Sequence, residues 1–106
     1  MLIELSDDNL TLGELASATK VSAETLVTMV HCGIVEPEGE GPEHWLFTST
    51  MVPVIQRAGR LQRDLELEWP AVALALDLMA DLQRLRDENK LLRRQLNALM
   101  ALDSSA

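Results

Sequence analysis

Aromatic residues and cysteine are scarce in this sequence. Phe, Trp and Tyr make up 3% of the 106 residues, so the apolar fraction of 47% comes mainly from Leu, Val and Ala, which are typical of helix packing. Cys32 is the only cysteine and cannot form an internal disulfide, which favours a reducing cytoplasm. A chain of this length predicts one small hydrophobic core.

The sequence also lacks long apolar runs and export signals. No stretch approaches the roughly 18 to 20 uncharged residues that span a bilayer. The N-terminus has neither the basic region nor the small-residue cleavage site of a signal peptide. We therefore expect a soluble, cytoplasmic protein that does not associate with membranes.

Motifs for catalysis and metal binding are missing as well. The sequence contains no pairing of nucleophile and base, no glycine-rich phosphate loop and no convergent carboxylates, so we expect neither an enzyme nor a cofactor. His31 and Cys32 are adjacent, but a metal site needs three or four ligands and only His44 could be added. We expect no metal site, and we expect Cys32 to be a buried apolar residue at a helix end.

The sequence does contain two strong helix-start signals. Thr11 and Glu14 have the spacing of a capping box, which predicts a helix beginning at Leu12. Ser22 is a second N-cap residue and predicts a helix over residues 23–32, which Gly33 can end in the left-handed conformation. The side chains expected to face inward are Leu12, Leu15 and Ala16 in the first helix and Leu26, Val27 and Val30 in the second. Together these helices predict a helix-turn-helix unit.

The excess acidic charge of the chain lies in the half that contains this unit. The first fifty residues contain nine acidic residues and a single base, Lys20, for a net charge of −8, whereas residues 51–106 sum to zero. Binding to DNA requires several Lys or Arg to neutralise phosphates. The candidate recognition helix has Glu24 as its only full charge, so we expect direct DNA binding to be disfavoured.

Short apolar runs around the helix-turn-helix predict a small β wing. Residues 45–47 should pair with residues 34–35 in a hairpin, to which a strand at residues 1–5 could add. The intervening segment 36–43 contains two prolines, two glycines and four glutamates, which is typical of a solvated loop.

A third helix should follow the wing. Its expected buried stripe consists of Val54, Ala58, Leu61 and Leu65, with Ile55 beside it. Gly59 inside this helix costs about 1 kcal/mol relative to alanine, so we expect a neighbouring element to approach it closely.

The last part of the chain predicts a long helix. No proline or glycine occurs between Pro70 and Leu102, and a continuous helix there would be about 50 Å long, too long to be buried by one small core. Residues at alternating spacings of four and three form the a/d seam of a coiled coil: Leu78, Leu82, Leu85, Asn89, Leu92, Leu96 and Leu99.

This seam predicts a homodimer, with Asn89 fixing the register. In a parallel pair Asp81 would meet Arg86, and Glu88 would meet Arg93. The alternatives are a helix that folds back on its own core and a helix that breaks near Ala80. We divide the chain into a winged helix-turn-helix domain (residues 1–68), a helical dimerisation segment (69–102) and a tail (103–106).

The order of these elements resembles the MerR family of winged helix-turn-helix regulators. Within that class the likeness is closer to the CbpM family of chaperone-modulatory proteins. The segments that carry it are GIVEP at residues 33–37, WLF at 45–47, LELEWP at 65–70 and ENKLLR at 88–93. The resemblance implies a mainly α fold with a small β wing and a C-terminal coiled-coil helix.

The resemblance also implies a function. Proteins of this family bind the J-domain of a CbpA-like co-chaperone in the bacterial cytoplasm, block its stimulation of Hsp70 and suppress its DNA binding. A J-domain presents a basic helix, so our hypothesis is that two acidic clusters with one tryptophan each contribute to the binding surface. The first acidic cluster is Glu36, Glu38, Glu40, Glu43 and Trp45, and the second is Asp64, Glu66, Glu68 and Trp69.

Other interpretations of these residues stay open. Both tryptophans could be packing residues, and the glutamate loop could serve solubility alone. A MerR-like transcriptional regulator is the alternative function, with phosphate contacts from Arg57, Arg60 and Arg63 or from Arg84 and Arg86. A third reading is a structural dimerisation module without a defined client.

Overall fold

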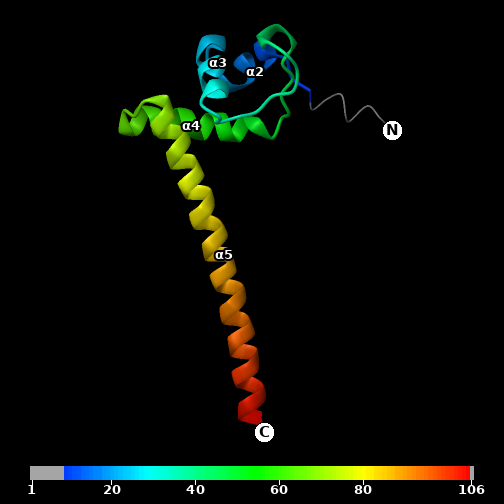
Figure 1. Ribbon diagram of the computed structural model, residues 1–106, viewed down its shortest axis with the longest axis vertical. Coiled ribbons are helices and arrows are strands. Elements are labelled where there is room, and N and C mark those ends of the chain that lie inside the picture. Colours follow the sequence, from blue (N-terminus) through cyan, green and yellow to red (C-terminus); the bar gives the residue numbers. More distant parts are fainter. Residues whose placement is uncertain (1–8, 106) are drawn as a thin grey trace, which may run out of the picture. The chain divides into compact units, whose positions relative to one another are not determined.

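The computed structural model describes residues 9–105, which form a mainly helical fold (Figure 1). The elements are α2 (Leu12–Thr19), α3 (Ala23–His31), the short 3-10 helix η1 (Pro42–His44), α4 (Met51–Leu65) and α5 (Trp69–Ser105). The strand expected at residues 1–5 lies outside the described residues. The chain forms two compact units, and the boundary between them falls within α5, between Leu76 and Asp77.

The helix-turn-helix starts where the sequence predicts. The Thr11 hydroxyl accepts a hydrogen bond from the Glu14 amide at 3.2 Å, and Glu14 Oε1 accepts one from the Thr11 amide at 2.9 Å, which completes the capping box. Ser22 Oγ likewise accepts from the Thr25 amide at 3.1 Å. The second helix ends at His31, one residue before the expected end, and Gly33 has a φ of 80°.

The core of the first unit lies between α2, α3, α4 and the first turn of α5. Its fully buried residues are Leu15, Leu26, Met29, Phe47, Ile55, Ala58 and Val72, with Val35 at 6% exposure. Met29 occupies the place we expected for Val27 and Val30, which are only partly buried. Leu26 and Met29 are three residues apart and therefore share one helix face.

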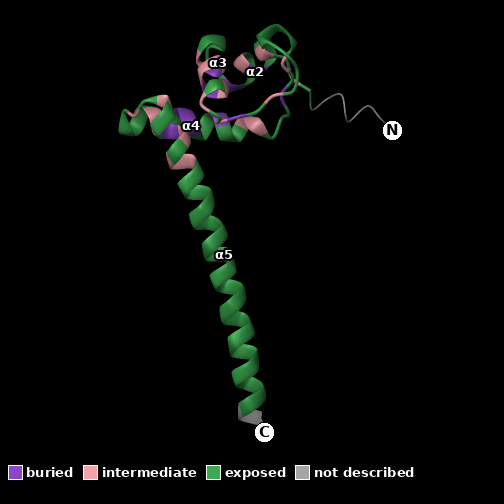
Figure 2. Ribbon diagram, viewed as in Figure 1, coloured by how far each residue is buried: buried purple, intermediate pink, exposed green. Residues whose placement is uncertain are grey.

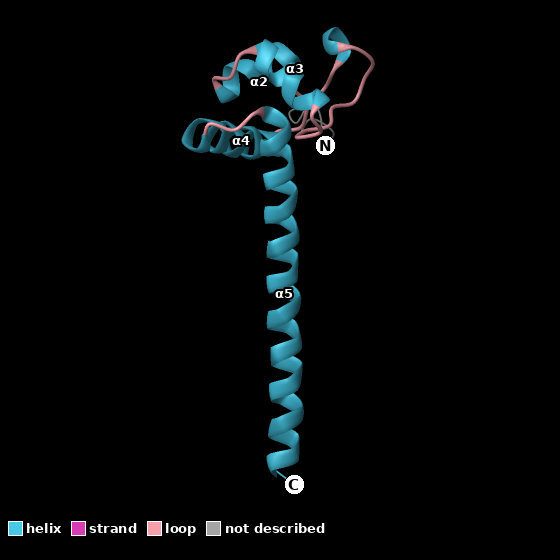
Figure 3. Ribbon diagram, turned by 60° about the vertical axis from the view of Figure 1, so that its left-hand side comes forward, coloured by secondary structure: helices cyan, strands magenta, loops and turns pink. Residues whose placement is uncertain are grey.

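The expected hairpin between residues 34–35 and 45–47 is not formed. In the part of the chain that the structure describes, β pairing is limited to two isolated bridges, Glu38 with Leu46 and Leu10 with Phe47, and Figure 3 draws no strand there. The Ile34 amide donates instead to the Met29 carbonyl at 3.0 Å, so residue 34 closes α3. The wing is a loop that the Glu38–Leu46 bridge closes.

The buried face of α4 matches the expected stripe at Ala58, with Ile55 beside it, but not at Val54 or Leu65. Ile55, Ala58 and Gly59 are buried, whereas Val54 is 38% exposed and Leu65 is 59% exposed. The expected close approach at Gly59 is also wrong. A Cβ atom added there would meet only Arg63 Nη1 of the same helix, at 3.5 Å.

The long C-terminal helix is continuous through Ala80, so the break considered there does not occur. Its first turns belong to the first unit, where Val72 is buried and Trp69 and Leu76 pack against the core. From Asp77 to Asp103 every residue is exposed (Figure 2). The second unit therefore presents a helix with no buried face of its own.

Candidate protein-binding surfaces

A groove of about 740 Å³ lies where α3, α4 and the start of α5 meet in the first unit. It contains three members of the second acidic cluster, Glu66, Glu68 and Trp69, but not Asp64, which is exposed nearby on α4. The complete lining is Thr28, Cys32, Gln62, Arg63, Glu66, Leu67, Glu68, Trp69 and Pro70.

The backbone between α4 and α5 sets the shape of this groove. Glu66 ends α4 in the left-handed conformation, with φ 52° and ψ 45°, and so turns the chain. Leu67 and Trp69 then pack against the core as partly buried residues. The Glu68 carbonyl accepts hydrogen bonds from the amides of Ala71 and Val72 at 2.9 and 3.0 Å, which start α5.

The floor and rim of the groove differ in chemistry. We call the partly buried Leu67 and Trp69 its apolar floor and the exposed Glu66 and Glu68 its rim. Within residues 9–105 neither carboxylate forms an ion pair, because the only ion pairs found there involve Arg84. Such a site can bury apolar side chains of a partner and attract basic residues around them.

The sequence did not indicate the part that α3 plays in this groove. Thr28 and Cys32 are four residues apart and lie on one helix face, so helical spacing could have paired them. They line the same groove as residues 62–70, which are about thirty residues away in the sequence, and no local sequence pattern indicates this proximity. Cys32 is only partly exposed at the end of α3, rather than fully buried as expected.

The first acidic cluster is arranged differently. Glu36, Glu38, Glu40 and Glu43 are all exposed on the wing loop. Trp45 is partly buried and packs against the core, and its ring meets Phe47 edge to face with centroids 6.1 Å apart. This tryptophan has the packing role considered as the alternative, while the glutamates remain available to solvent.

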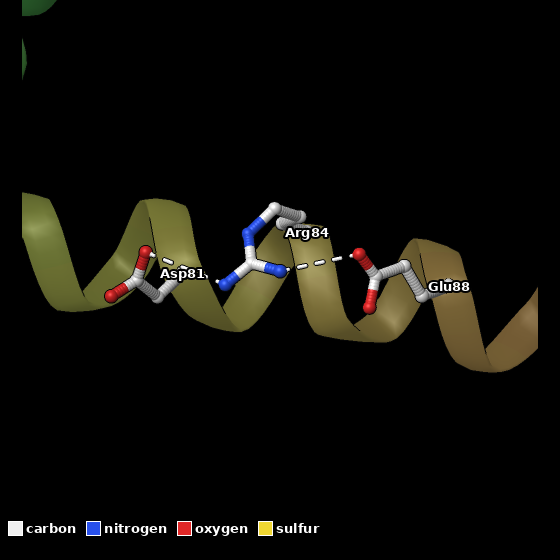
Figure 4. Close-up of polar contacts among 3 residues, drawn as sticks. All are labelled: Asp81, Arg84 and Glu88. Atoms are coloured by element: carbon white, nitrogen blue, oxygen red, sulfur yellow. Dashed lines mark hydrogen bonds and ion pairs between the residues drawn. The ribbon is translucent and has the colours of Figure 1, made fainter.

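The seam expected for dimerisation lies on the exposed part of α5. Its six leucines have exposed fractions between 47% and 64%, from Leu82 to Leu99. Asn89 Oδ1 accepts a hydrogen bond from Arg93 Nε at 2.7 Å. Arg84 lies 3.9 Å from Asp81 and 3.2 Å from Glu88, so both carboxylates have a partner within the helix (Figure 4).

Basic residues gather at one place on the first unit. Lys20, Arg60 and Arg63 line a groove of about 370 Å³ between the end of α2 and α4. Arg57 is exposed on the same helix. This small cluster contains the only base of the first fifty residues.

Residues 9–105 show no sign of a metal site or of a membrane-spanning helix. No group of three or more His, Cys, Asp or Glu is placed to hold a metal ion within that range. No helix among the described residues combines the length and apolar character needed to cross a membrane.

Comparison with known proteins gives consistent matches. Residues 10–94 match the model of the MerR HTH family of regulatory proteins. The chain is 44% identical over 88 residues to the chaperone modulatory protein CbpM of Pseudomonas putida KT2440, covering 83% of this chain and 87% of that protein. It is 41% identical over 91 residues to the protein of the same name from Escherichia coli O9:H4, covering 86% and 90%.

Proposed function

The chain belongs to the CbpM family of chaperone modulatory proteins, within the MerR HTH family, and on this premise we propose that it inhibits a J-domain co-chaperone. It binds the J-domain of a CbpA-like protein through an acidic surface. Binding blocks stimulation of the partner Hsp70 and suppresses the co-chaperone's own DNA binding. The relatives are bacterial, and a bacterial cytoplasmic location fits this role.

The observation that carries this proposal is the charge of the half of the chain that contains the helix-turn-helix. The first fifty residues carry a net charge of −8, and α3 contains no Lys or Arg. A recognition helix without bases gains no counterion release at a DNA backbone and is repelled by it. The same negative potential attracts a basic protein surface and speeds its association.

Inhibition requires only that this chain covers the basic face of the J-domain. A J-domain whose basic face is covered by this chain cannot present that face to Hsp70 or to DNA phosphates. Charge then sets the association rate, and buried apolar contacts set the lifetime of the complex. No catalytic step or cofactor enters this mechanism.

Calorimetric titration of the full chain with the purified J-domain of a CbpA-like co-chaperone tests the proposal. We expect saturable binding that weakens as salt is raised, because exposed charges are screened within about 10 Å at 0.1 M salt. The complex should also lower the Hsp70 ATPase rate that the J-domain stimulates. Absence of binding at low salt would overturn the proposal.

We also propose that two chains pair through α5. The support is the row of exposed leucines at Leu78, Leu82, Leu85, Leu92, Leu96 and Leu99, which leaves a helix face without a partner. On this view residues 1–68 together with Trp69 bind the client, and the dimer contact lies within residues 69–102. Residues 103–105 continue α5 and do not form a separate tail.

A MerR-like DNA-binding regulator is the second candidate. The family match and the groove lined by Lys20, Arg60 and Arg63 favour it. A gel-shift titration at low salt separates the two functions. Salt-sensitive shifting of duplex DNA would support the regulator, and its absence together with J-domain binding would support the modulator.

A further inference from the structure

The proposed function does not say where on the chain the J-domain docks. The groove between α3, α4 and the start of α5 is a candidate docking site. Its volume of about 740 Å³ exceeds those of the described grooves beside α2, which are about 370 and 390 Å³. It is open along one side, so it can take side chains projecting from a partner helix. We propose that the J-domain docks here, by inserting apolar side chains of a helix that carries Lys or Arg beside them.

The apolar floor supports this assignment. Leu67 and Trp69 are held in place by their packing against the core, yet both retain exposed surface in the groove. A tryptophan fixed in this way loses little conformational freedom on binding, and such residues dominate the affinity of protein interfaces. One part of the Trp69 side chain therefore packs against the core, and the exposed part contacts the partner.

The rim supports basic flanks on the partner. Glu66 and Glu68 are exposed and form no ion pair with any described residue, and Arg63 is the one cation in the lining. Asp64 adds a third carboxylate close by in the sequence. An apolar helix with acidic flanks would be repelled by this rim.

Glu66 ends α4 with a φ of 52°, where glycine is the usual residue because it has no Cβ. Lys20 ends α2 in the same way, with a φ of 62°. The two residues therefore offer a matched pair of positions for substitution by glycine, one at the groove rim and one away from it.

The third wall is α3, the helix that enters the major groove in DNA-binding helix-turn-helix proteins. Here the end of α3 contributes Thr28 and Cys32 to the docking groove. The helix-turn-helix unit thus takes part in client binding directly, as one side of the groove that receives the partner helix.

Alkylation of Cys32 tests the groove without changing the sequence at the site. Cys32 is the only cysteine and is partly exposed, so N-ethylmaleimide labels one position. We expect saturating J-domain to slow this labelling about 10-fold or more, because bound protein excludes the reagent. A Ser17→Cys variant supplies a control thiol on exposed α2, and its labelling rate should stay the same. If Cys32 is labelled at the same rate with and without the bound J-domain, the groove is not the docking site.

A matched pair of glycine variants tests the rim. Glu66→Gly and Lys20→Gly both relieve a positive φ at a helix end, so neither should lower stability. We expect Glu66→Gly to weaken J-domain binding about 3- to 5-fold at low salt, as is typical of a rim charge. Lys20→Gly should leave binding unchanged or slightly tighter. If Glu66→Gly binds the J-domain as tightly as the wild-type protein does, Glu66 does not contribute to the binding site.

A steric block tests the wall that α3 provides. Thr28→Arg places a long, positively charged side chain in the groove and should weaken binding about 30-fold or more. Ala18→Arg makes the same change in charge on exposed α2 and should have little effect. The groove assignment rests on the proposed function, and the two fail differently. Wild-type protein that does not bind the J-domain refutes both, whereas binding that ignores Thr28→Arg and leaves Cys32 reactive refutes the groove alone.

Discussion

Two leucines of α5 with equal exposure provide a sharp test of the proposed dimer. Leu82 lies on the a/d seam and Leu91 lies off it, and each is 47% exposed in the single chain. Truncation of either residue to alanine removes the same three carbon atoms from the same helix. Any difference between the two variants therefore reports the helix face on which dimerisation occurs.

The size of the effect follows from the exposed fraction of Leu82. Three buried methyl or methylene groups are worth about 2.4 kcal/mol at ~0.8 kcal/mol each. About half of this surface is still exposed in the single chain, so pairing gains about 1.2 kcal/mol per leucine. A two-fold dimer contains the residue twice, and a loss of about 2.4 kcal/mol raises the dimer Kd about 50-fold.

Sedimentation equilibrium over a range of protein concentrations measures this change directly. Leu82→Ala should shift the monomer–dimer midpoint to about 50-fold higher concentration, and Leu91→Ala should move it less than about twofold. Circular dichroism of both variants controls for helix content, which alanine should preserve. If both variants dissociate equally, or if neither does, the seam is not the dimer contact.

Four further substitutions test other parts of the structure. Thr11→Ala removes the capping box and should lower the free energy of unfolding by about 1 kcal/mol, measured by urea denaturation. Gly39→Ala should lower the free energy of unfolding by about 2 kcal/mol or more, because Gly39 has a φ of 108° and a Cβ there would overlap the His44 carbonyl. Gly13→Ala should raise the free energy of unfolding by about 0.5 kcal/mol, because a Cβ at this position on α2 meets open space. Asn89→Leu should tighten the dimer, seen as a midpoint at lower concentration, because it replaces a polar residue of the seam with an apolar one.

Features that depend on neighbouring residues could be predicted from the sequence. The capping box at Thr11 and Glu14, the N-cap at Ser22 and the continuous helix after Trp69 involve residues within four positions of one another. Their signals can therefore be read from the local sequence, although packing against the core supplies most of the stability of such short helices. These predictions are confirmed.

The buried face of α4 and the pairing of the wing could not be predicted in the same way. The hydrophobic pattern favoured Val54, Ala58, Leu61 and Leu65, but of these only Ala58 is fully buried, together with Ile55 and Gly59, on the helix that contacts α2. The wing register depends on the Ile34 amide, which bonds to the end of α3 instead of a strand. The buried face of α4 depends on contacts between elements, which no local pattern encodes. The bond from Ile34 to Met29 is local, a helix end around Gly33, and it formed in place of the strand that Ile34 and Val35 favour.

The candidate site shows the same division. Composition and charge located Glu66, Glu68 and Trp69 near each other, since they are adjacent in sequence. The sequence could not indicate that Thr28 and Cys32 face them, because about thirty residues separate the two segments. For Trp45 the sequence left an interface role and a packing role open, and the structure packs this residue against the core and Phe47.

The ion pairs within α5 reduce the effect of charge on whether two helices pair parallel or antiparallel. In a parallel pair Asp81 and Glu88 would pair with Arg86 and Arg93 of the other chain, but within one helix both carboxylates already lie beside Arg84. Exchanging one exposed ion pair for another gains little, because each contributes about 0.2 to 1 kcal/mol. Asn89 also has a partner, Arg93, in its own helix. The apolar seam therefore provides the energy of pairing, and the order of large and polar residues along it has more influence on orientation than the flanking charges.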